Sequence, residues 1–317
     1  MLPQIIDGTK IAQKIKQEVY KELKQIKSKL NIVPKIVSIV VEETPATTVY
    51  VKNQSKICNE LGINFEILTF NSQISQEEVE QRIIQLNNDS KVNAIMLNLP
   101  LPKHLNQIKL QNKISPLKDV EGITAENLGK LFYAETSPIV APCTALSVIE
   151  CIKSTQVELK GKEVVIVGHS EIVGKPVLLM LLSSLLNSPT PTVCHIATKN
   201  LKEHTKRADI LIVAVGKPNL ITEDMVKEGV IVIDVGINRI KVLDKDGKEI
   251  IDEKTNKPKT KIVGDVDFEN VSKKSSFITP VPGGVGVVTT CILAKNLLNL
   301  VKFQYSLPVE GYKIFNT

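Results

Sequence analysis

A glycine-flanked turn at residues 168–174 is the part of the sequence best suited to bind phosphate. It reads Gly-His-Ser-Glu-Ile-Val-Gly and lies between a predicted buried strand, Glu163–Val167, and an apolar helical stretch, Val177–Leu186. Glycines allow close approach of backbone to a ligand, and a helix N-terminus presents unpaired N–H groups with partial positive charge. We predict a dinucleotide-binding turn. An ordinary strand-to-helix turn is the alternative, because the spacing departs from Gly-x-Gly-x-x-Gly.

The charges around this turn bear on which dinucleotide binds. An NAD site usually has an Asp or Glu near the end of the second strand, where it binds the ribose hydroxyls. The sequence has no acidic residue between Glu171 and Glu203, and His169, His195 and Lys199 are nearby. Basic groups suit a 2′-phosphate, so the sequence favours NADP, with NAD as the alternative.

Composition argues against several other kinds of site. The five cysteines form no Cys-x-x-Cys pair and the four histidines show no metal-ligand spacing, so we expect reduced thiols and no metal. The net charge is +6, and a lysine cluster lies in a polar stretch without aromatic residues, at Lys254, Lys257, Lys259 and Lys261. We interpret this cluster as a solvated loop and expect no nucleic-acid partner.

No segment predicts a membrane span or a secretory signal. The apolar stretch Val177–Leu186 is about half the length of a bilayer-spanning helix. The first residues include Asp7 and Gly8 and lack a basic flank followed by an apolar block. We expect a cytoplasmic protein with no membrane partner; an organellar location stays open if a leader was removed.

Hydrophobic periodicity places these residues on alternating strands and helices. Apolar residues spaced by three or four from Ile11 to Leu30 predict an amphipathic helix. We expect strands at 36–41, 65–70 and 94–99, a helix from the cap Thr44-Pro45 to Leu61, and a helix opened by the capping box Ser75–Glu78. Such alternation indicates a parallel sheet covered by helices.

The same pattern restarts after residue 160. We expect strands at 163–167, 192–195, 210–215 and 230–235, a surface hairpin or loop at 241–261, and a last helix at 289–300. The sequence therefore predicts an α/β protein of two domains, with a boundary near residues 145–160.

Motifs along the chain resemble the methylenetetrahydrofolate dehydrogenase/cyclohydrolase family. They are Pro45-Ala46-Thr47 with Tyr50-Val51, Leu99–Pro102, Lys118–Gly122, Pro142-Cys143-Thr144, Gly168–Pro176, Val232–Asn238, Val263–Val266 and Ile278–Gly286. The last, Ile-Thr-Pro-Val-Pro-Gly-Gly-Val-Gly, is highly specific. The resemblance covers about residues 3–302.

The resemblance implies two domains, each with a mainly parallel sheet, separated by a cleft that binds folate. It assigns residues 1–145 to a folate-binding catalytic domain, which the C-terminal helix 289–302 completes. It assigns 146–288 to a Rossmann-type NAD(P)-binding domain and leaves 303–317 as a tail. It also implies tetrahydrofolate derivatives as ligands and a homodimer formed through the nucleotide domain.

The family's site residues carry over position by position. The resemblance implies as catalytic residues Tyr50, Gln54, Asn98 and Glu121. It implies that substrate is bound by Tyr50, Leu97, Asn98, Leu99, Glu121, Pro282, Gly283, Gly284, Val285 and Gly286. It implies that the cofactor is bound by Gly168, His169, Ser170, Val173, Gly174, Ile196 and Ile237.

The folate positions depart from the family pattern. Gln54 stands where the family has a lysine, one helical turn after Tyr50, and an amide cannot carry or shuttle a proton. Asn98 replaces a glutamine and is shorter by one methylene, whereas Glu121 replaces an aspartate and is longer by one. Partial compensation between the two is conceivable.

The nucleotide positions depart as well. His169 replaces an arginine, and Ile196 replaces a serine that often contacts the 2′-phosphate in the family. Loss of a permanently charged bidentate donor weakens the case for NADP without supplying an NAD-type carboxylate. The family's Pro-Met after Gly-Val-Gly is Val287-Val288 here.

We predict that the protein oxidises 5,10-methylenetetrahydrofolate to 5,10-methenyltetrahydrofolate with a nicotinamide nucleotide. The resemblance also implies methenyltetrahydrofolate cyclohydrolase activity, which Gln54 puts in question. The alternative is a non-catalytic homologue that acts as a binding or scaffold subunit. An unrelated hydroxy-acid dehydrogenase would leave the stretch Thr279–Gly286 unexplained.

Overall fold

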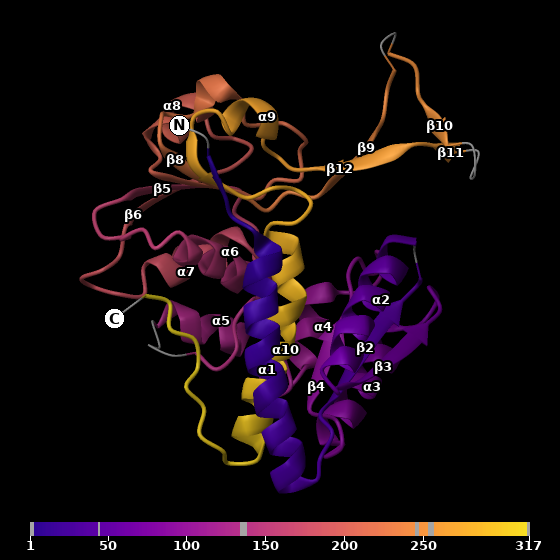
Figure 1. Cartoon of the computed structure of the whole chain (residues 1–317). Coiled ribbons are helices and arrows are strands. Elements are labelled where there is room, and N and C mark those ends of the chain that lie inside the picture. Colours follow the sequence, from indigo (N-terminus) through magenta and orange to yellow (C-terminus); the bar gives the residue numbers. More distant parts are fainter. Residues whose placement is uncertain (1–2, 44, 134–137, 245–246, 253–256, 316–317) are drawn as a thin grey trace. The chain divides into compact units, whose positions relative to one another are not determined.

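The computed structural model describes residues 3–43, 45–133, 138–244, 247–252 and 257–315; Thr44 and Lys254 lie outside these ranges. The chain forms two compact units (Figure 1), one made of residues 1–11 and 147–288 and the other of residues 12–146 and 289–317. We call them the six-stranded and the three-stranded unit, after their largest sheets. The chain passes between them within α1 (Gly8–Leu30), α6 (Cys143–Ser154) and α10 (Val285–Gln304).

The three-stranded unit is built on the parallel sheet β3-β2-β4. Its central strand β2 is almost entirely buried, as expected for a strand of a parallel sheet covered on both faces. The predicted capping box is confirmed: the Glu78 N–H donates to Ser75 Oγ, and the Ser75 N–H donates to Glu78 Oε2. The elements are β2 (Lys35–Val41), α2 (Pro45–Glu60), β3 (Asn64–Phe70), α3 (Gln76–Asn88), β4 (Ala94–Leu97), α4 (Gln107–Lys113) and α5 (Ala125–Phe132).

Helices α1 and α10 run side by side (Figure 1), and within the three-stranded unit Glu22 and Lys302 form an ion pair between them. The predicted apolar face of α1 is buried through Ile15, Val19 and Leu23. Among the described residues, only α10 is long and apolar enough to cross a membrane, yet 67% of its most apolar window is buried within the protein. This burial is typical of a helix in a hydrophobic core.

The six-stranded unit contains the parallel sheet β1-β13-β8-β7-β5-β6. Its edge strand β1, near the start of the chain, pairs with β13, the last strand in the sequence. This pairing makes residues 1–11 part of the six-stranded unit. The elements are β1 (Gln4–Ile5), β5 (Glu163–Val167), α7 (Gly174–Leu181), β6 (Thr190–Cys194), α8 (Leu201–Arg207), β7 (Ile210–Val213), the 3-10 helix η1 (Glu223–Met225), β8 (Val230–Asp234), α9 (Phe268–Val271) and β13 (Ser275–Ile278). The α/β class with a mainly parallel sheet in each unit is confirmed.

An antiparallel arm projects from the six-stranded unit (Figure 1). It pairs β9 (Asn238–Lys241) with β12 (Thr260–Val263), and β10 (Ile251–Asp252) with β11 (Lys257–Pro258). The hairpin expected within residues 241–261 is therefore confirmed.

Several predicted boundaries are wrong, among them those of the last helix, expected at 289–300, which is α10, from Val285 to Gln304. The helix expected at 177–186 is α7, which ends at Leu181; the Ser183 hydroxyl donates to the Met180 carbonyl there (2.8 Å). The strand expected at 94–99 is β4, which ends at Leu97; the Asn98 side chain that follows bonds to β2.

Candidate functional site

Tyr50 and Gln54 lie one turn apart on α2, as the sequence predicts. Gln54 is 1% exposed, whereas Lys52 and Lys56 on the same helix are exposed to solvent. The Gln54 Oε1 atom is buried and accepts no hydrogen bond from any residue that the structure describes. Leaving a buried acceptor unpaired costs on the order of 1–3 kcal/mol, so this oxygen is a ready partner for a donor on a ligand or a water molecule.

Asn98 presents a second buried acceptor. Its amide nitrogen donates to Ser38 Oγ (2.7 Å) and to the Ile39 carbonyl (2.8 Å), both on β2. These bonds fix the amide, and its Oδ1 is left buried without a partner among the described residues. The Leu97 side chain packs in the hydrophobic core, so only its backbone is available to a ligand, and Leu99 follows half-buried.

A rigid loop carries Glu121. The buried Asp119 carboxylate accepts hydrogen bonds from the N–H groups of Gly122 (2.9 Å) and Thr124 (2.8 Å) and from the Asn127 amide (2.9 Å). Gly122 has φ +68°, and a Cβ there would lie 2.4 Å from the Ala141 carbonyl carbon, so only glycine fits. The loop therefore has little freedom to move Glu121.

The Glu121 carboxyl is electrostatically unusual. Burial, followed by the negative charge of Asp119, raises the pKa of Glu121 to about 8, although a backbone hydrogen bond at Leu97 lowers it. Much of this carboxyl is therefore protonated at neutral pH and can donate a hydrogen bond.

The same environment acts on Tyr50. Its side chain keeps 45% of its surface, yet burial around the hydroxyl, with Glu121 and Cys143, raises the Tyr50 pKa, and a bond from Gln54 lowers it. Burial and the two carboxyls Glu121 and Asp119 likewise raise the pKa of the Cys143 thiol. One group of residues that interact electrostatically or by hydrogen bonding thus comprises Tyr50, Gln54, Glu121 and Cys143. Together with Asn98, we call it the amide–carboxyl cluster. Sequence reasoning missed Cys143 as a member, although it lies in a motif that carries the resemblance.

In the six-stranded unit, the predicted dinucleotide turn follows β5. Gly168 has φ +116°, and a Cβ there would lie 2.2 Å from the Ala214 carbonyl oxygen. A Cβ at Gly174, the first residue of α7, would lie 2.0 Å from the Gly168 carbonyl oxygen. Ser170 is half-buried within the turn, and Val173 before the helix is buried and makes no side-chain cap. The turn is tightly packed and leads into a helix N-terminus without a side-chain cap, which is the kind of site that binds a pyrophosphate.

The sheet order places this turn at a topological switch point. Strand β5 lies between β6 and β7, so the chain builds the sheet outward from β5 in both directions. In doubly wound sheets, ligands bind at such a point, just beyond the carboxyl ends of the strands. The strands β5, β6, β7 and β8 are each followed by an exposed apolar residue, which is Ile172, Ile196, Val215 and Ile237 in that order. Sequence reasoning named Ile196 and Ile237 but missed Val215 and Gly216. The feature that could have identified these two residues is the sequence Ala-Val-Gly of small residues at 214–216, which follows a buried strand.

Two histidines meet where the second strand ends. His169 follows β5 and His195 follows β6, and their ring centroids are 5.0 Å apart at a tilt of 53°. Both are exposed, and neighbouring Ile196 is fully exposed. The structure therefore places the imidazoles of His169 and His195 next to each other at the position where an NAD site has its carboxylate.

Two aspartates brace the loops at this edge. Asp234 accepts hydrogen bonds from the N–H groups of Gly236, Asp265 and Val266, each at 3.0 Å. The Asp265 carboxylate accepts from the N–H groups of Val215 (2.6 Å) and Gly216 (2.9 Å). Burial raises the pKa of Asp234 to about 6 despite these bonds.

The predicted substrate stretch Pro282–Gly286 belongs to the six-stranded unit, whereas the amide–carboxyl cluster belongs to the other unit. The Val281–Pro282 peptide is cis, Gly283 has φ +105°, and the Gly8 N–H donates to the Gly283 carbonyl (3.0 Å). Gly284 and Val285 are buried, while Pro282 and Gly286 are exposed. A Cβ at Gly286 would lie 3.4 Å from Ile237 Cδ1, so this stretch adjoins a predicted cofactor residue.

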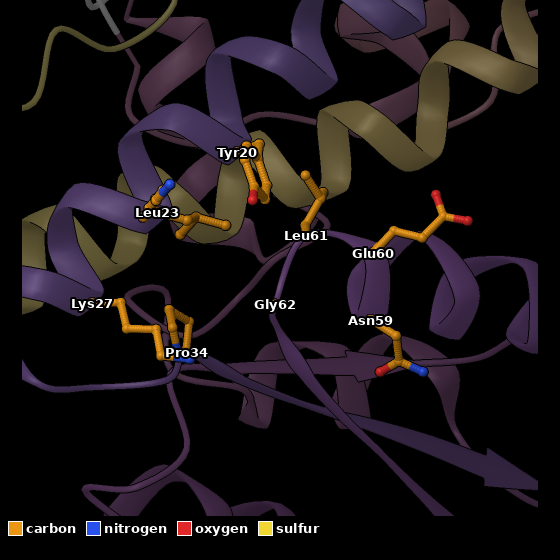
Figure 2. A pocket seen from close by; sticks show the side chains of 9 residues that line it. Tyr20, Leu23, Lys27, Pro34, Asn59, Glu60, Leu61 and Gly62 are labelled. Atoms are coloured by element: carbon orange, nitrogen blue, oxygen red, sulfur yellow. The ribbon is translucent and has the colours of Figure 1, made fainter.

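A pocket of about 420 Å³ lies elsewhere in the three-stranded unit (Figure 2). Side chains of α1, the following loop and the end of α2 line it, among them Tyr20, Leu23, Lys27, Pro34 and Leu61. None of the predicted site residues lines this pocket. No group of three or more His, Cys, Asp or Glu residues suited to a metal ion occurs within the described part of the chain.

Comparison with known proteins bears on both units. A family model described as tetrahydrofolate dehydrogenase/cyclohydrolase, catalytic domain, matches residues 6–121, and its NAD(P)-binding domain matches residues 142–305. A bifunctional protein FolD from a Nitratiruptor species is 44% identical over 299 residues, covering 94% of this chain and 98% of that protein.

Solved structures resemble the chain over nearly its full length. The bifunctional FolD methylenetetrahydrofolate dehydrogenase/cyclohydrolase from Campylobacter jejuni has a TM-score of 0.85 at 42% identity, covering 95% of this chain and 99% of that one. The Trypanosoma brucei enzyme, complexed with NADP and an inhibitor, has a TM-score of 0.87 at 31% identity and covers 96% of this chain and 99% of that one.

Proposed function

The chain belongs to the tetrahydrofolate dehydrogenase/cyclohydrolase family, and we propose that it oxidises 5,10-methylenetetrahydrofolate to 5,10-methenyltetrahydrofolate with NADP. We propose further that it hydrolyses the methenyl product only slowly. The observation that carries this proposal is the buried Gln54, whose amide oxygen has no partner in the described chain and which bonds to Tyr50, the neighbour of Glu121.

The six-stranded unit fits a dinucleotide. Its glycines at 168 and 174 let the backbone of the turn pack tightly at the N-terminus of α7, and the turn lies at the switch point of the sheet. A bound nicotinamide nucleotide supplies the hydride acceptor. The task of the protein is then to hold donor and acceptor carbons in near-attack geometry.

Oxidation of the methylene bridge is compatible with an amide at position 54. Loss of a hydride from the bridging carbon leaves a cation, and no proton has to move. The acceptors on Gln54 and Asn98 and the protonated carboxyl of Glu121 can hold folate donors and acceptors without changing their own protonation state. Dehydrogenation therefore needs orientation more than acid–base chemistry.

Hydrolysis of the methenyl cation makes a different demand. Water must add to the bridging carbon and lose both of its protons as it becomes the formyl oxygen, while the ring nitrogen that leaves the carbon must gain one, so one proton is released overall. Gln54 cannot transfer any of these protons, and the raised pKa of Tyr50 keeps its hydroxyl neutral. Glu121 is the remaining titratable group of the cluster near neutral pH, so we expect slow hydrolysis rather than none.

A paired absorbance assay at the methenyl-folate band tests the proposal. One arm supplies methylenetetrahydrofolate with NADP or NAD, and the other supplies methenyltetrahydrofolate alone. We expect methenyl product to accumulate in the first arm and to decay near the background rate in the second. Hydrolysis as fast as oxidation would overturn the second half of the proposal.

Replacing Gln54 tests the role of the amide directly. Gln54→Lys should raise hydrolysis about tenfold or more while changing oxidation less, because positioned acid–base catalysis typically contributes ~10²–10⁴. The matched control is Asn53→Lys, which adds the same charge on the exposed face of α2 and should leave hydrolysis unchanged. Equal effects of the two lysines would show that overall charge, not position 54, matters.

The alternative, a non-catalytic binding or scaffold subunit, predicts silence in both arms. The braced Glu121 loop and the two amide oxygens without a partner among the described residues favour a site that binds a ligand over a scaffold without one, because buried acceptors are normally paired. Silence in both arms from folded protein that a folate analogue fails to stabilise would support the alternative.

Three finer properties complete the proposal. The paired rings of His169 and His195 support NADP over NAD, and the two nucleotides in the assay compare them directly. Exposed leucines after α7, Leu185 and Leu186, support a homodimer formed through the six-stranded unit. A cytoplasmic location stays a prediction.

A further inference from the structure

A tyrosine near the C-terminus lies in the core of the three-stranded unit. The family-model matches end at residue 305, so Tyr312 lies beyond both of them. Tyr312 is nevertheless only 2% exposed, and its backbone N–H donates to the Pro138 carbonyl at 3.0 Å. Ile314, two residues later, is buried as well. A terminal segment with buried side chains and a paired backbone is tied to its unit.

The Tyr312 hydroxyl is connected to a buried amide on α10. It donates a hydrogen bond of 2.8 Å to Oδ1 of Asn296, whose side chain is fully buried. The Asn296 Nδ2 donates in turn to the carbonyl oxygens of Val120 (2.8 Å) and Ala141 (3.0 Å) and lies 3.4 Å from Cys143 Sγ. All polar atoms of this amide are thus satisfied, and the tyrosine supplies the donor on its oxygen side.

The groups that Asn296 holds surround Glu121. Val120 directly precedes Glu121, and the Ala141 backbone packs against Gly122, where a Cβ would lie within 2.4 Å. Cys143 belongs to the amide–carboxyl cluster, and its Sγ lies 3.6 Å from the Val120 carbonyl oxygen. One buried amide therefore ties the Glu121 loop to residues 141–143.

We propose that Tyr312 is a positioning residue, which acts through Asn296 to hold the loop that presents Glu121 to the folate. The inference rests on the proposed function, in which Glu121 binds the substrate. Without the hydroxyl, Asn296 Oδ1 would be buried and unpaired, and relaxation of the amide would loosen its bonds to Val120 and Ala141.

Tyr312→Phe tests this role because it removes only the hydroxyl. We expect the KM for methylenetetrahydrofolate to rise about threefold to tenfold, with kcat changed less and the KM for NADP unchanged. Carboxyl NMR of selectively labelled protein, with Glu121→Gln to assign the signal, should show the Glu121 pKa moving toward that of an ordinary carboxyl as water gains access.

Two matched variants separate positioning from stability. Tyr305→Phe removes a hydroxyl from a tyrosine that is 38% exposed, and Ile314→Val trims a buried side chain of the same segment without touching the hydrogen bonds. Both should leave the Glu121 titration and the folate KM at their wild-type values, even if Ile314→Val lowers the melting temperature.

The outcomes distinguish this inference from the proposed function. If Tyr312→Phe lowers the melting temperature but leaves both the Glu121 titration and the folate KM unchanged, its role is structural only and the inference is overturned. If the wild-type protein does not oxidise methylenetetrahydrofolate, the proposed function fails, and the NMR titration still decides whether Tyr312 controls Glu121.

Discussion

At the scale of single residues, the amide–carboxyl cluster combines unpaired acceptors with a carboxyl that resists ionisation. Gln54 and Asn98 each keep one buried oxygen without a partner in the described chain, and the pKa of Glu121 is raised to about 8. A site of this kind binds a polar, hydrogen-bonding ligand well and moves protons poorly. This chemistry matches a hydride transfer better than a hydrolysis.

Glu121 should make the stability of the protein depend on pH. Because its folded pKa lies above the unfolded value, its contribution is fully present below about pH 4.5 and is lost as the pH rises through about 8. Glu121→Gln, which stays neutral, should therefore gain stability relative to wild type across this window, reaching on the order of 5 kcal/mol at pH 9, because each pKa unit corresponds to about 1.4 kcal/mol. Urea unfolding at pH 5, 7 and 9 measures the difference.

The control for this prediction is Glu126→Gln, which removes an exposed carboxylate that pairs with Lys130 at 3.1 Å. Exposed ion pairs contribute little, so its stability should run parallel to that of wild type over the same pH range. A Glu121→Gln variant that also runs parallel to wild type would contradict the raised pKa.

At the scale of elements, close contacts between backbones decide where glycine is required. The turn from β5 to α7 packs Gly174 on the Gly168 carbonyl and Gly168 on the end of β7. The brace of Asp234 and Asp265 leaves equally little room, since a Cβ at Gly264 would lie 1.8 Å from Asp234 Oδ2. These contacts hold the loops of the predicted nucleotide site in place without large side chains.

Gly174→Ala should damage the nucleotide site. The added Cβ would lie 2.0 Å from a carbonyl oxygen, so the turn must shift, which we expect to weaken NADP binding about tenfold or more and to destabilise the unit by ~1–3 kcal/mol. Titration of NADP by fluorescence and thermal unfolding measure the two effects.

The matched control is Gly129→Ala, also a glycine within a helix. No described residue lies within 4 Å of a Cβ at this position of α5, so alanine should raise stability by up to about 1 kcal/mol through its helix propensity and leave NADP binding unchanged. Unchanged NADP affinity in Gly174→Ala would show that the turn does not bind the nucleotide.

At the scale of the whole molecule, the apolar side chains of Leu185 and Leu186, which follow α7, are exposed rather than buried in the core. Leu185 is 99% exposed and Leu186 is 74% exposed, on the unit through which we propose dimerisation. Contiguous exposed apolar residues are typical of an interface between protein chains. This surface also explains why the sequence reads as helical beyond Leu181, since its residues are as apolar as those of the core.

The double substitution Leu185→Glu, Leu186→Glu should convert the proposed homodimer to a monomer, because two charges would be buried without partners at the interface. Light scattering after size-exclusion chromatography measures the mass directly. Ile108→Glu, an exposed apolar residue on α4 in the other unit, is the control and should leave the mass unchanged. A wild-type protein that is already monomeric would contradict the prediction.

The sequence by itself determined the alternation of strands and helices, the capping box at Ser75, the turn at Gly168 and the family, because each depends on residues close together in the chain. The tertiary structure decided the rest. It brought together His169 with His195, Asp234 with Asp265, and Tyr312 through Asn296 with the Glu121 loop. It also showed that the Gln54 and Asn98 oxygens have no partner among the described residues, and that α7 ends before Leu185 and Leu186. Local periodicity predicts which face of an element is apolar, but the partner of a buried polar atom depends on segments far away in the chain.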